Sequence, residues 1–279
     1  MNGDTVVDVS AVLEFLPASV WPHPHGDAVI THLDKLRPRI SELLKQGDAL
    51  PLGGVMLKSP IANPGKIIGA PVNYKAHLEE TNLDKDVMPG QTIHPIEDIG
   101  LFLKATSSLA GPGEGIEINF PNRRTDHEAE VVVVIGKQGR NLREEEALDH
   151  IAGYCLGLDM SLRGREDRGF RKSCDTYAVL GPWLTTAEHV PDPADIPFSL
   201  TVNGETRQKS NTRQLILSIA KLIVMASAYY TLYPGDVIMT GTPEGISPVM
   251  PGDVIAVESP LLGRFEASVR ESVTSGPPY

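Results

Sequence analysis

The sequence predicts an α+β fold built mainly from mixed, short strands. Three observations lead to this prediction. Apolar and β-branched runs separated by turn residues follow one another from residue 66 onward. One helical pattern interrupts them over residues 212–232. The regular alternation of strands and helices that marks a doubly wound fold is missing.

The first 65 residues differ from the rest, and we expect a small N-terminal domain over residues 1–65 and a second domain over residues 66–279. Apolar residues recur at helical spacing over residues 28–36. The same pattern returns after Pro38, which is expected to end one helix or begin the next. Turn-rich sequence ending in Asn63-Pro64-Gly65 then separates this segment from the strands.

Strands are expected over residues 67–68, 101–104, 116–120, 128–135, 154–161, 198–202 and from 205 onward. Asn203-Gly204 joins the last two, and this pair favours a two-residue hairpin turn. Two further turns, Pro234-Gly235-Asp236 and Pro251-Gly252-Asp253, each lead into a β-branched run.

Two helices are expected among these strands. The longer one covers residues 212–232, with Asn211 or Thr212 as its N-cap, and its apolar face should pack against the sheet. The shorter one covers residues 143–151 and is expected to end before Gly153.

Composition excludes several classes of function. The chain has 279 residues and a net charge of -11, and no basic stripe that would bind nucleic acid. No run of ~18 apolar residues is present, which argues against membrane insertion. The N-terminus carries no basic region, and Cys155 and Cys174 form no disulfide framework. We therefore expect a cytoplasmic protein.

The most informative motif is the acidic pair Glu128 and Glu130 at the start of an apolar strand. Alternate side chains of a strand share a face, so both carboxylates project to the same side and repel each other. A hard divalent cation such as Mg²⁺, Mn²⁺ or Ca²⁺ takes oxygen ligands and would relieve this repulsion. The pattern alone also fits two solvated glutamates on an exposed strand end.

Asp159 is a candidate third oxygen ligand near the end of the strand expected over residues 154–161. It shares a face with the small residues Cys155 and Gly157, which leaves room for its carboxylate to reach a ligand. If this strand lies beside Glu128 and Glu130, three oxygen donors converge. Taken alone, Asp159 also fits a turn-forming residue at a strand end.

His77 and Glu80 are candidates for a general base and the group that orients it. They lie three residues apart, so on a helical turn they share a face. A neutral imidazole accepts a proton from water near neutral pH, and an adjacent carboxylate stabilises the resulting cation. An exposed surface pair is the alternative interpretation.

Cationic and turn residues supply candidate anion-binding groups. Lys104, Arg163 and Lys172 each lie in or just after a segment that ends near the expected site. A substrate that carries a carboxylate and develops negative charge needs such donors. The glycine-rich turn around Thr242 offers backbone N–H groups for a carboxylate. Each of these residues alone also fits an ordinary surface or turn position.

In their order along the chain, these motifs resemble the fumarylacetoacetate hydrolase family, and the resemblance spans about residues 66 to 270. The motifs that carry it are Ile68-Gly69, Asn73-Tyr74, His77 with Glu80, Phe102-Leu103-Lys104, Glu128-Ala129-Glu130, Asp159 with Arg163, Lys172 with Asp175-Thr176, Leu180-Gly181-Pro182-Trp183 and Thr240-Gly241-Thr242-Pro243. The resemblance implies a mixed β-roll, a homodimer and a variable N-terminal domain.

The resemblance also implies roles for individual residues. Metal binding, to Mg²⁺ or Mn²⁺, falls to Glu128, Glu130 and Asp159. Catalysis falls to His77, Glu80 and Lys172, and substrate binding to Tyr74, Lys104, Arg163, Lys172 and Thr242. The chain departs from the family at Glu166, where members commonly have Gln. We expect this carboxylate to pair with Arg165 or Arg163.

The function that the resemblance implies is hydrolysis of a C–C bond in an acylpyruvate or 2,4-diketo acid. The products would be a 2-oxo acid such as pyruvate and a second carboxylic acid. A related possibility is an oxaloacetate decarboxylase or tautomerase, or an isomerase of an unsaturated 2-oxo acid. A possibility of another class is a non-catalytic, metal-dependent binder of an anionic metabolite.

Overall fold

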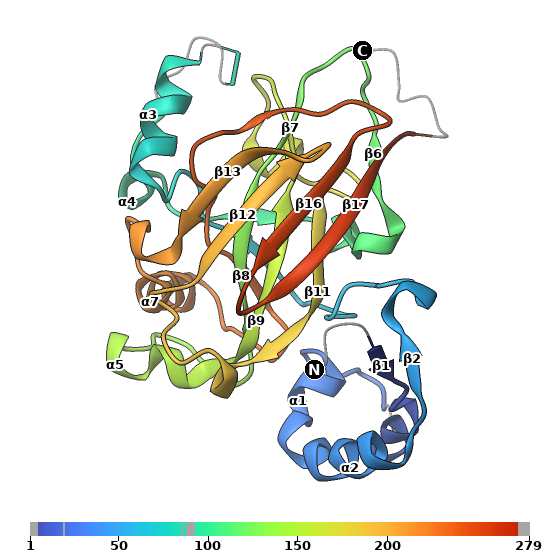
Figure 1. Cartoon of the computed structure of the whole chain (residues 1–279). Helices are drawn as coiled ribbons and strands as arrows, with labels where there is room; N and C mark the ends of the chain where they lie inside the picture. The colour runs from blue at the N-terminus through green and yellow to red at the C-terminus, as the bar shows by residue number, and fades with distance from the viewer. Residues whose placement is uncertain (1–4, 19, 85, 88–92, 273–279) are drawn as a thin grey trace.

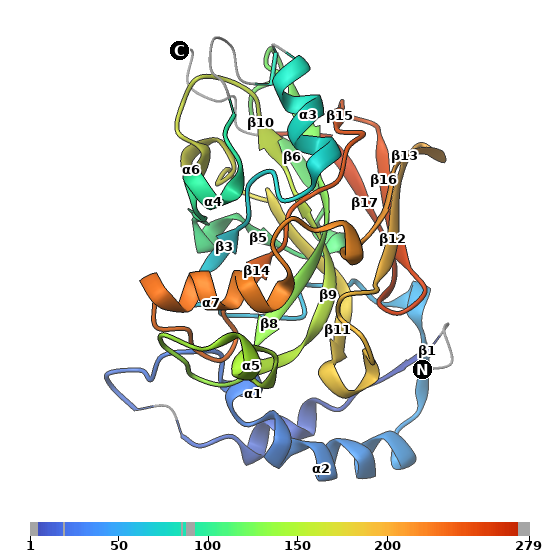
Figure 2. The same cartoon turned by 90° about the vertical axis from the view of Figure 1, so that its left-hand side faces the viewer.

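The computed structural model describes residues 5–18, 20–84, 86–87 and 93–272. Two β-sheets face each other in its main body, and the N-terminal helices cover one end (Figure 1). Figure 2 shows α2 (Leu33–Gln46) across that end and α3 (Lys75–Leu83) at the opposite end. No helix in the described part of the chain is long and apolar enough to cross a membrane.

The larger sheet has seven strands of mixed direction. In spatial order they are β4 (Phe102–Lys104), β3 (Ile67–Gly69), β14 (Val237–Met239), β8 (Ala129–Ile135), β9 (Ile151–Asp159), β11 (Ala178–Thr186) and β5 (Leu109–Ala110). Only the β3–β14 and β11–β5 pairs are parallel. The predicted mixture of short strands is confirmed.

A second sheet of five strands faces the first. Its order is β13 (Glu205–Asn211), β12 (Pro197–Val202), β16 (Val254–Ser259), β17 (Gly263–Glu271) and β6 (Ile116–Ile118). A three-stranded sheet, β10 (Ser161–Leu162), β7 (Thr125–His127) and β15 (Ser247–Pro248), continues β8 and β9 toward α3. A two-stranded sheet joins β1 (Thr5–Val7) and β2 (Ala49–Pro51).

The remaining helices are short. They are α1 (Ala28–Thr31), α4 (Ile96–Ile99), α5 (Glu144–Ala147), α6 (Arg168–Arg171) and α7 (Ile219–Tyr229), with 3₁₀ turns at Ser10–Phe15, Leu52–Gly54, Thr106–Ser108, Pro112–Glu114, Leu148–His150, Ala187–His189 and Thr212–Gln214.

The hydrophobic core lies on both faces of the large sheet. Val131 and Val133 of β8 pack with Leu200 and Val257 of the second sheet, and α7 adds Leu222 to the same cluster. On the opposite face Val132 and Val134 cluster with residues of the N-terminal region such as Ile30 and Ile61. All seven residues of β8 are buried, which explains why its sequence is a continuous apolar run.

The predicted hairpin is confirmed. Strands β12 and β13 pair across Asn203 and Gly204, both of which have positive φ, at 51° and 81°. Positive φ at both central residues is the geometry that two-residue turns matching the twist of the strands require.

The predicted long helix is too long at its N-terminal end. It packs on the sheet as expected, but α7 begins at Ile219, with Ser218 as N-cap, and Asn211 caps only a separate 3₁₀ turn. The intervening residues are held out of the helix by Asn73. The N–H of Ile216 donates to the Asn73 carbonyl, and that of Leu217 to the Asn73 side chain, both at 2.8 Å.

Two other predicted boundaries are wrong. Pro38 lies inside α2, and the break between helices falls at His32 instead. Pro38 and Asp34 are exposed, so water can bond the carbonyl that proline leaves without a partner. The shorter helix, α5, ends at Ala147, a 3₁₀ turn continues it to His150 within the predicted range, and Gly153 belongs to β9. A Cβ at Gly153 would come 2.3 Å from the Thr185 carbonyl oxygen, so close strand packing accounts for this glycine.

The two Pro-Gly-Asp turns look alike in sequence but differ in burial. Asp236 is fully buried, and its carboxylate accepts the backbone N–H groups of Lys66 at 2.9 Å and Tyr233 at 2.7 Å. The Lys66 ammonium lies 2.6 Å from the same carboxylate. Asp253 lies near the surface, and it accepts from Met250 and Asn203.

We predict that Asp236→Ala lowers the free energy of unfolding by about 3 kcal/mol, because it leaves buried donors and a lysine charge without a partner. The matched change Asp253→Ala should cost about 1 kcal/mol or less, since water can replace its carboxylate. Urea denaturation of both variants measures the difference. Equal losses would contradict this account of the two turns.

Candidate metal centre and catalytic site

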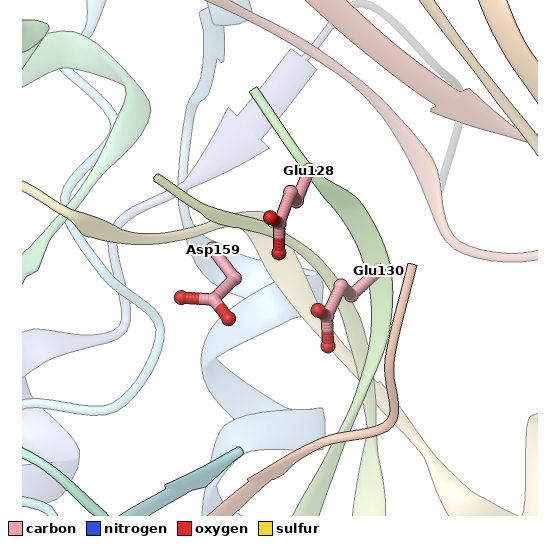
Figure 3. A group of neighbouring side chains, drawn as sticks. All are labelled: Glu128, Glu130 and Asp159. Atoms are coloured by element: carbon pink, nitrogen blue, oxygen red, sulfur yellow. The ribbon is translucent and has the colours of Figure 1, made fainter. Parts of the chain in front are cut away.

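Three acidic side chains meet where β8 begins and β9 ends. Glu128 links β7 to β8, Glu130 is the second residue of β8, and Asp159 ends β9. Glu130 is paired with Gly157 in the strand register, and the Asp159 N–H donates to the Glu128 carbonyl at 2.9 Å. Figure 3 shows the three carboxylates turned toward one another. One carboxylate oxygen from each residue lies within 4.8 Å of the other two.

The donor set suits a hard divalent cation. All three side chains are buried, and each offers carboxylate oxygen. Burial and the negative charge of Asp159 raise the pKa of Glu130 well above its usual range. Its Oε2 accepts one hydrogen bond, from the Gly241 N–H at 2.7 Å. Carboxylates crowded in this way have unmet demand for positive charge, which Mg²⁺ or Mn²⁺ meets.

Buried cations hold these carboxylates in place. Lys172 Nζ donates to Glu128 Oε2 at 2.5 Å and to Asp159 Oδ2 at 2.7 Å. Arg163 donates to Glu128 Oε1 at 2.7 Å. Burial opposes ionisation of Glu128, but the positive charges of Lys172 and Arg163 outweigh it and hold the pKa of Glu128 below its usual range.

Lys104 contacts the carboxylate centre from outside the cavity. Its ammonium donates to the Asp159 carboxylate and, at 3.0 Å, to the Tyr177 carbonyl. Burial is the largest influence on this ammonium and lowers its pKa. Lys104 does not line the cavity at the centre, so the structure places it as a support for Asp159 rather than at a substrate-facing position.

The predicted dyad lies on α3 at the wall of the same cavity. His77 Nδ1 is 3.2 Å from Glu80 Oε2. The other carboxylate oxygen of Glu80 accepts the Gly245 N–H at 2.9 Å. His77 lines the cavity and Glu80 stands behind it, as expected for a base and the group that orients it.

The turn over residues 240–245 connects the dyad with the carboxylates. Gly241 has a φ of 101°, and a Cβ there would come 2.7 Å from the Asn73 Cβ. Only glycine therefore lets this N–H reach Glu130. Thr242 lines the cavity, and its Oγ1 accepts a hydrogen bond from Gln208 at 2.8 Å. The hydroxyl hydrogen of Thr242 is left to donate to a ligand.

The cavity encloses about 400 Å³, counting its open mouth. Its polar wall contains the three carboxylates, His77, Thr242 and four cationic side chains. Its apolar wall includes Val72, Ile93 and Phe102. This combination of a charged end and an apolar side is typical of a site for a small organic anion.

Tyr74, predicted to bind substrate, does not line this cavity. Its side chain is 1% exposed and packs edge-on against Phe198, with ring centroids 6.5 Å apart. Its hydroxyl has no hydrogen-bond partner among the described residues. Burial, together with the negative charge of Glu130, raises the pKa of this hydroxyl.

The predicted partners of Glu166 are wrong. Its carboxylate accepts two hydrogen bonds from Arg123, at 2.8 and 2.9 Å, and none from Arg165 or Arg163. Arg123 also donates to the Arg163 carbonyl at 2.8 Å, so it crosslinks the segment from its outer side. Arg123 holds the pKa of Glu166 below its usual range through these hydrogen bonds. Glu166 therefore faces away from the cavity, and it does not line it.

Sequence reasoning missed several residues that shape the centre. Asp126 is fully buried and accepts from Arg163 at 2.8 Å and Arg124 at 2.7 Å. Ser161 donates to Glu128 at 2.9 Å. Asp126 continues the two-residue alternation of Glu128 and Glu130, and that pattern was a usable signal. Arg168 and Arg171 also line the cavity, but nothing in their basic sequence context separates them from surface arginines.

The chain belongs to the fumarylacetoacetate hydrolase family, since residues 66–270 match the model described as fumarylacetoacetate (FAA) hydrolase C-terminal. The predicted family is confirmed.

Two relatives show which activities occur among similar members of the family. The chain is 49% identical over 273 residues to maleylpyruvate hydrolase of Aquipseudomonas alcaligenes, across 97% of this chain and 95% of that one. It is 37% identical to a mitochondrial oxaloacetate tautomerase of Xenopus laevis, across 96% and 83% of the two chains.

Solved structures agree with the sequence relatives. Maleylpyruvate hydrolase of Sphingobium sp. SYK-6, in complex with manganese(II) ion and pyruvate, superposes with a TM-score of 0.81 at 38% identity, across 98% of this chain and 95% of that one. The predicted fold is confirmed. The chain is a metal-dependent hydrolase of this family, as the acidic motif and the resemblance predicted.

We predict that Glu130→Gln weakens Mn²⁺ binding by about 100-fold or more, because the centre loses one of its three charged ligands. Without metal, the same variant should melt at a higher temperature than wild type, since carboxylate repulsion is reduced. Titration calorimetry and thermal melts in chelator measure the two effects.

Glu166→Gln is the matched control, because it makes the same chemical change outside the cavity. Its Mn²⁺ affinity should equal that of wild type. Unchanged affinity in Glu130→Gln would mean that Glu130 is not a ligand.

Proposed function

We propose that this enzyme hydrolyses a C–C bond in an acylpyruvate or 2,4-diketo acid. The products are a 2-oxo acid such as pyruvate and a carboxylic acid. The observation that carries the proposal is that the carboxylate centre and the His77–Glu80 dyad face one cavity. The similarity to a maleylpyruvate hydrolase supports it, since maleylpyruvate is itself an acylpyruvate.

Metal binding is assigned to Glu128, Glu130 and Asp159. A divalent ion held there polarises the oxygens of a bound 2-oxo acid and offsets negative charge that develops on it. The proposal takes Mg²⁺ or Mn²⁺ as the native ion, and Mn²⁺ is the ion in the Sphingobium relative.

The dyad activates water in this proposal. Glu80, held by the Gly245 N–H, accepts the hydrogen of His77 Nδ1 and so leaves Nε2 of the neutral ring as the base. His77 Nε2 takes a proton from water, and the hydroxide adds to the carbonyl carbon of the acyl group. The bond between that carbon and the 2-oxo acid part then breaks.

The electron pair of the broken bond stays on the 2-oxo acid part, which a proton then neutralises to give pyruvate or its analogue. Lys172 lies between Glu128 and Asp159, and its ammonium stabilises this negative charge. Thr242 donates its free hydroxyl hydrogen to the substrate's carboxylate, and Arg163 adds positive charge nearby. Lys104 acts through Asp159, to which its ammonium donates a hydrogen bond.

A second candidate is conversion of oxaloacetate, by tautomerisation or decarboxylation, or isomerisation of an unsaturated 2-oxo acid. The similarity to an oxaloacetate tautomerase favours it. These reactions need no attacking water, so the products distinguish them from hydrolysis. A protein that binds such acids without turning them over is the remaining alternative.

We further propose a cytoplasmic homodimer in which residues 1–65 form a variable domain beside the catalytic one. The two free cysteines fit a reducing compartment. The family resemblance supports the dimer, and sedimentation of the purified protein tests it.

Acylpyruvates absorb in the ultraviolet as enolised diketones, and hydrolysis removes this absorbance. We predict loss of absorbance with release of pyruvate when enzyme and Mg²⁺ or Mn²⁺ are added, and no loss in excess chelator. Identification of both acids by mass spectrometry separates hydrolysis from isomerisation. No loss across a panel of acylpyruvates would exclude the proposal.

His77→Ala should lower kcat for hydrolysis by about 10²–10⁴-fold, because it removes the base, while Mn²⁺ affinity stays at the wild-type value. Surface His189→Ala is the control and should keep full activity. Wild-type turnover by His77→Ala would refute the role of the dyad, and a parallel loss of Mn²⁺ binding would point to a structural role instead.

A further inference from the structure

Arg168, the first residue of α6, lines the cavity beside the carboxylate centre. Among the described residues, no carboxylate lies within ion-pair distance of its guanidinium, and that group has no hydrogen-bond partner. Glu128, Asp167 and Asp159 are the acidic residues that favour its charged form most strongly, by electrostatic attraction without a direct contact. A cation of this kind is available to a ligand.

The other cations of the cavity wall are already engaged. Arg163 bonds Asp126 and Glu128, and Lys172 bonds Glu128 and Asp159. Arg171 donates to the carbonyls of Leu162 at 2.8 Å and Glu166 at 2.9 Å. These groups form the frame of the centre, and Arg168 is not required for it.

Placement of Arg168 carries an energetic cost. Burial lowers its pKa, since a guanidinium loses water there without gaining a carboxylate partner. Asp167 does not offset this loss, because its carboxylate caps α6 through the Gly169 N–H at 2.8 Å. A half-buried charge without a partner is costly to keep unless a bound anion pairs with it.

The net charge of the cavity wall also favours a ligand with more than one negative charge. Three carboxylates and four cations, Arg163, Arg168, Arg171 and Lys172, line it. With a divalent ion bound, the wall therefore has a net charge of about three positive units, which exceeds the single charge of a 2-oxo monocarboxylate. A substrate with two carboxylates matches this field better.

We propose that Arg168 binds a second carboxylate, carried at the far end of the acyl group, and so selects dicarboxylic acylpyruvates. This inference rests on the proposed function. The planar guanidinium can make two parallel hydrogen bonds to that carboxylate. Helix α6 packs against β4, whose Phe102 belongs to the apolar wall that would hold the acyl chain between the two charged ends.

Binding tests the inference without turnover. We compare 2-oxoheptanedioate, whose distal carboxylate has the spacing of that in succinylpyruvate, with 2-oxoheptanoate, which has a methyl group in its place, by titration calorimetry with Mg²⁺. Wild type should bind 2-oxoheptanedioate at least ~10-fold more tightly. Arg168→Met should abolish this preference and leave 2-oxoheptanoate affinity unchanged, while Arg168→Lys should keep part of it as a point charge.

Arg165→Met is the matched control. It removes an exposed arginine three residues away that does not line the cavity, and it should keep the wild-type preference. Thermal melts check folding, and Arg168→Met should melt no lower than wild type because it removes a half-buried, unpaired charge. A preference that survives in Arg168→Met would overturn the inference.

Turnover gives a second, separable test with succinylpyruvate and butanoylpyruvate, which differ in the same way. Arg168→Met should lower kcat/KM by about 100-fold for succinylpyruvate and by less than about threefold for butanoylpyruvate. Equal losses on both would mean that Arg168 serves the shared 2-oxo acid end, and the inference fails. If wild type cleaves neither acid yet prefers 2-oxoheptanedioate through Arg168, the hydrolase proposal fails and the subsite stands.

Discussion

The mutual repulsion of three buried carboxylates is the constraint on which the rest of the site depends. Glu128, Glu130 and Asp159 are buried, and one carboxylate oxygen from each lies within 4.8 Å of the other two. Coulomb interactions at such separations are strong where the dielectric is low. The fold tolerates this arrangement because Lys172 bridges two of the carboxylates and a backbone N–H bonds the third. Each carboxylate oxygen can accept more than one bond, and Oε1 of Glu130 accepts no hydrogen bond from the described residues, so a hard cation can still bind here and neutralise the remaining charge.

One turn sets the spacing between the metal centre and the base. The Gly241 N–H bonds Glu130, and four residues later the Gly245 N–H bonds Glu80. Asn73, just before α3, donates to the Thr240 carbonyl at 2.9 Å and so fastens the start of the helix to the same turn. The dyad and Glu130 therefore come from distant parts of the sequence but are hydrogen-bonded to one short segment. Catalysis by a positioned base depends on such spacing, since small displacements of reacting groups cost large factors in rate.

The parts of this site that could be predicted from sequence are those set by local periodicity. The two-residue repeat of a strand places Glu128 and Glu130 on one face, and it predicts the face of Asp159 as well. The start of α7 could not be predicted in this way, because the hydrogen bonds that Ile216 and Leu217 donate to Asn73, more than 140 residues earlier, hold these two residues out of the helix. The partner of Glu166 could not be predicted either, because Arg123 lies 43 residues away in the sequence. Tertiary contacts of this kind leave no periodic signal in the sequence.

Arg123 and Arg168 use the same guanidinium group for different purposes. Arg123 stabilises the fold, and we propose that Arg168 recognises the substrate. Arg123, on the outer side of the segment, has a bidentate carboxylate partner in Glu166. Arg168, on the inner side, has none among the described residues, although the chain carries 36 acidic residues against 25 basic ones. A shortage of carboxylates therefore does not explain its isolation. An arginine kept unpaired in a cavity lowers the stability of the fold, and such a cost is retained where a ligand recovers it on binding. Specificity then follows from the same cost, because a substrate without the distal carboxylate leaves the charge unpaired.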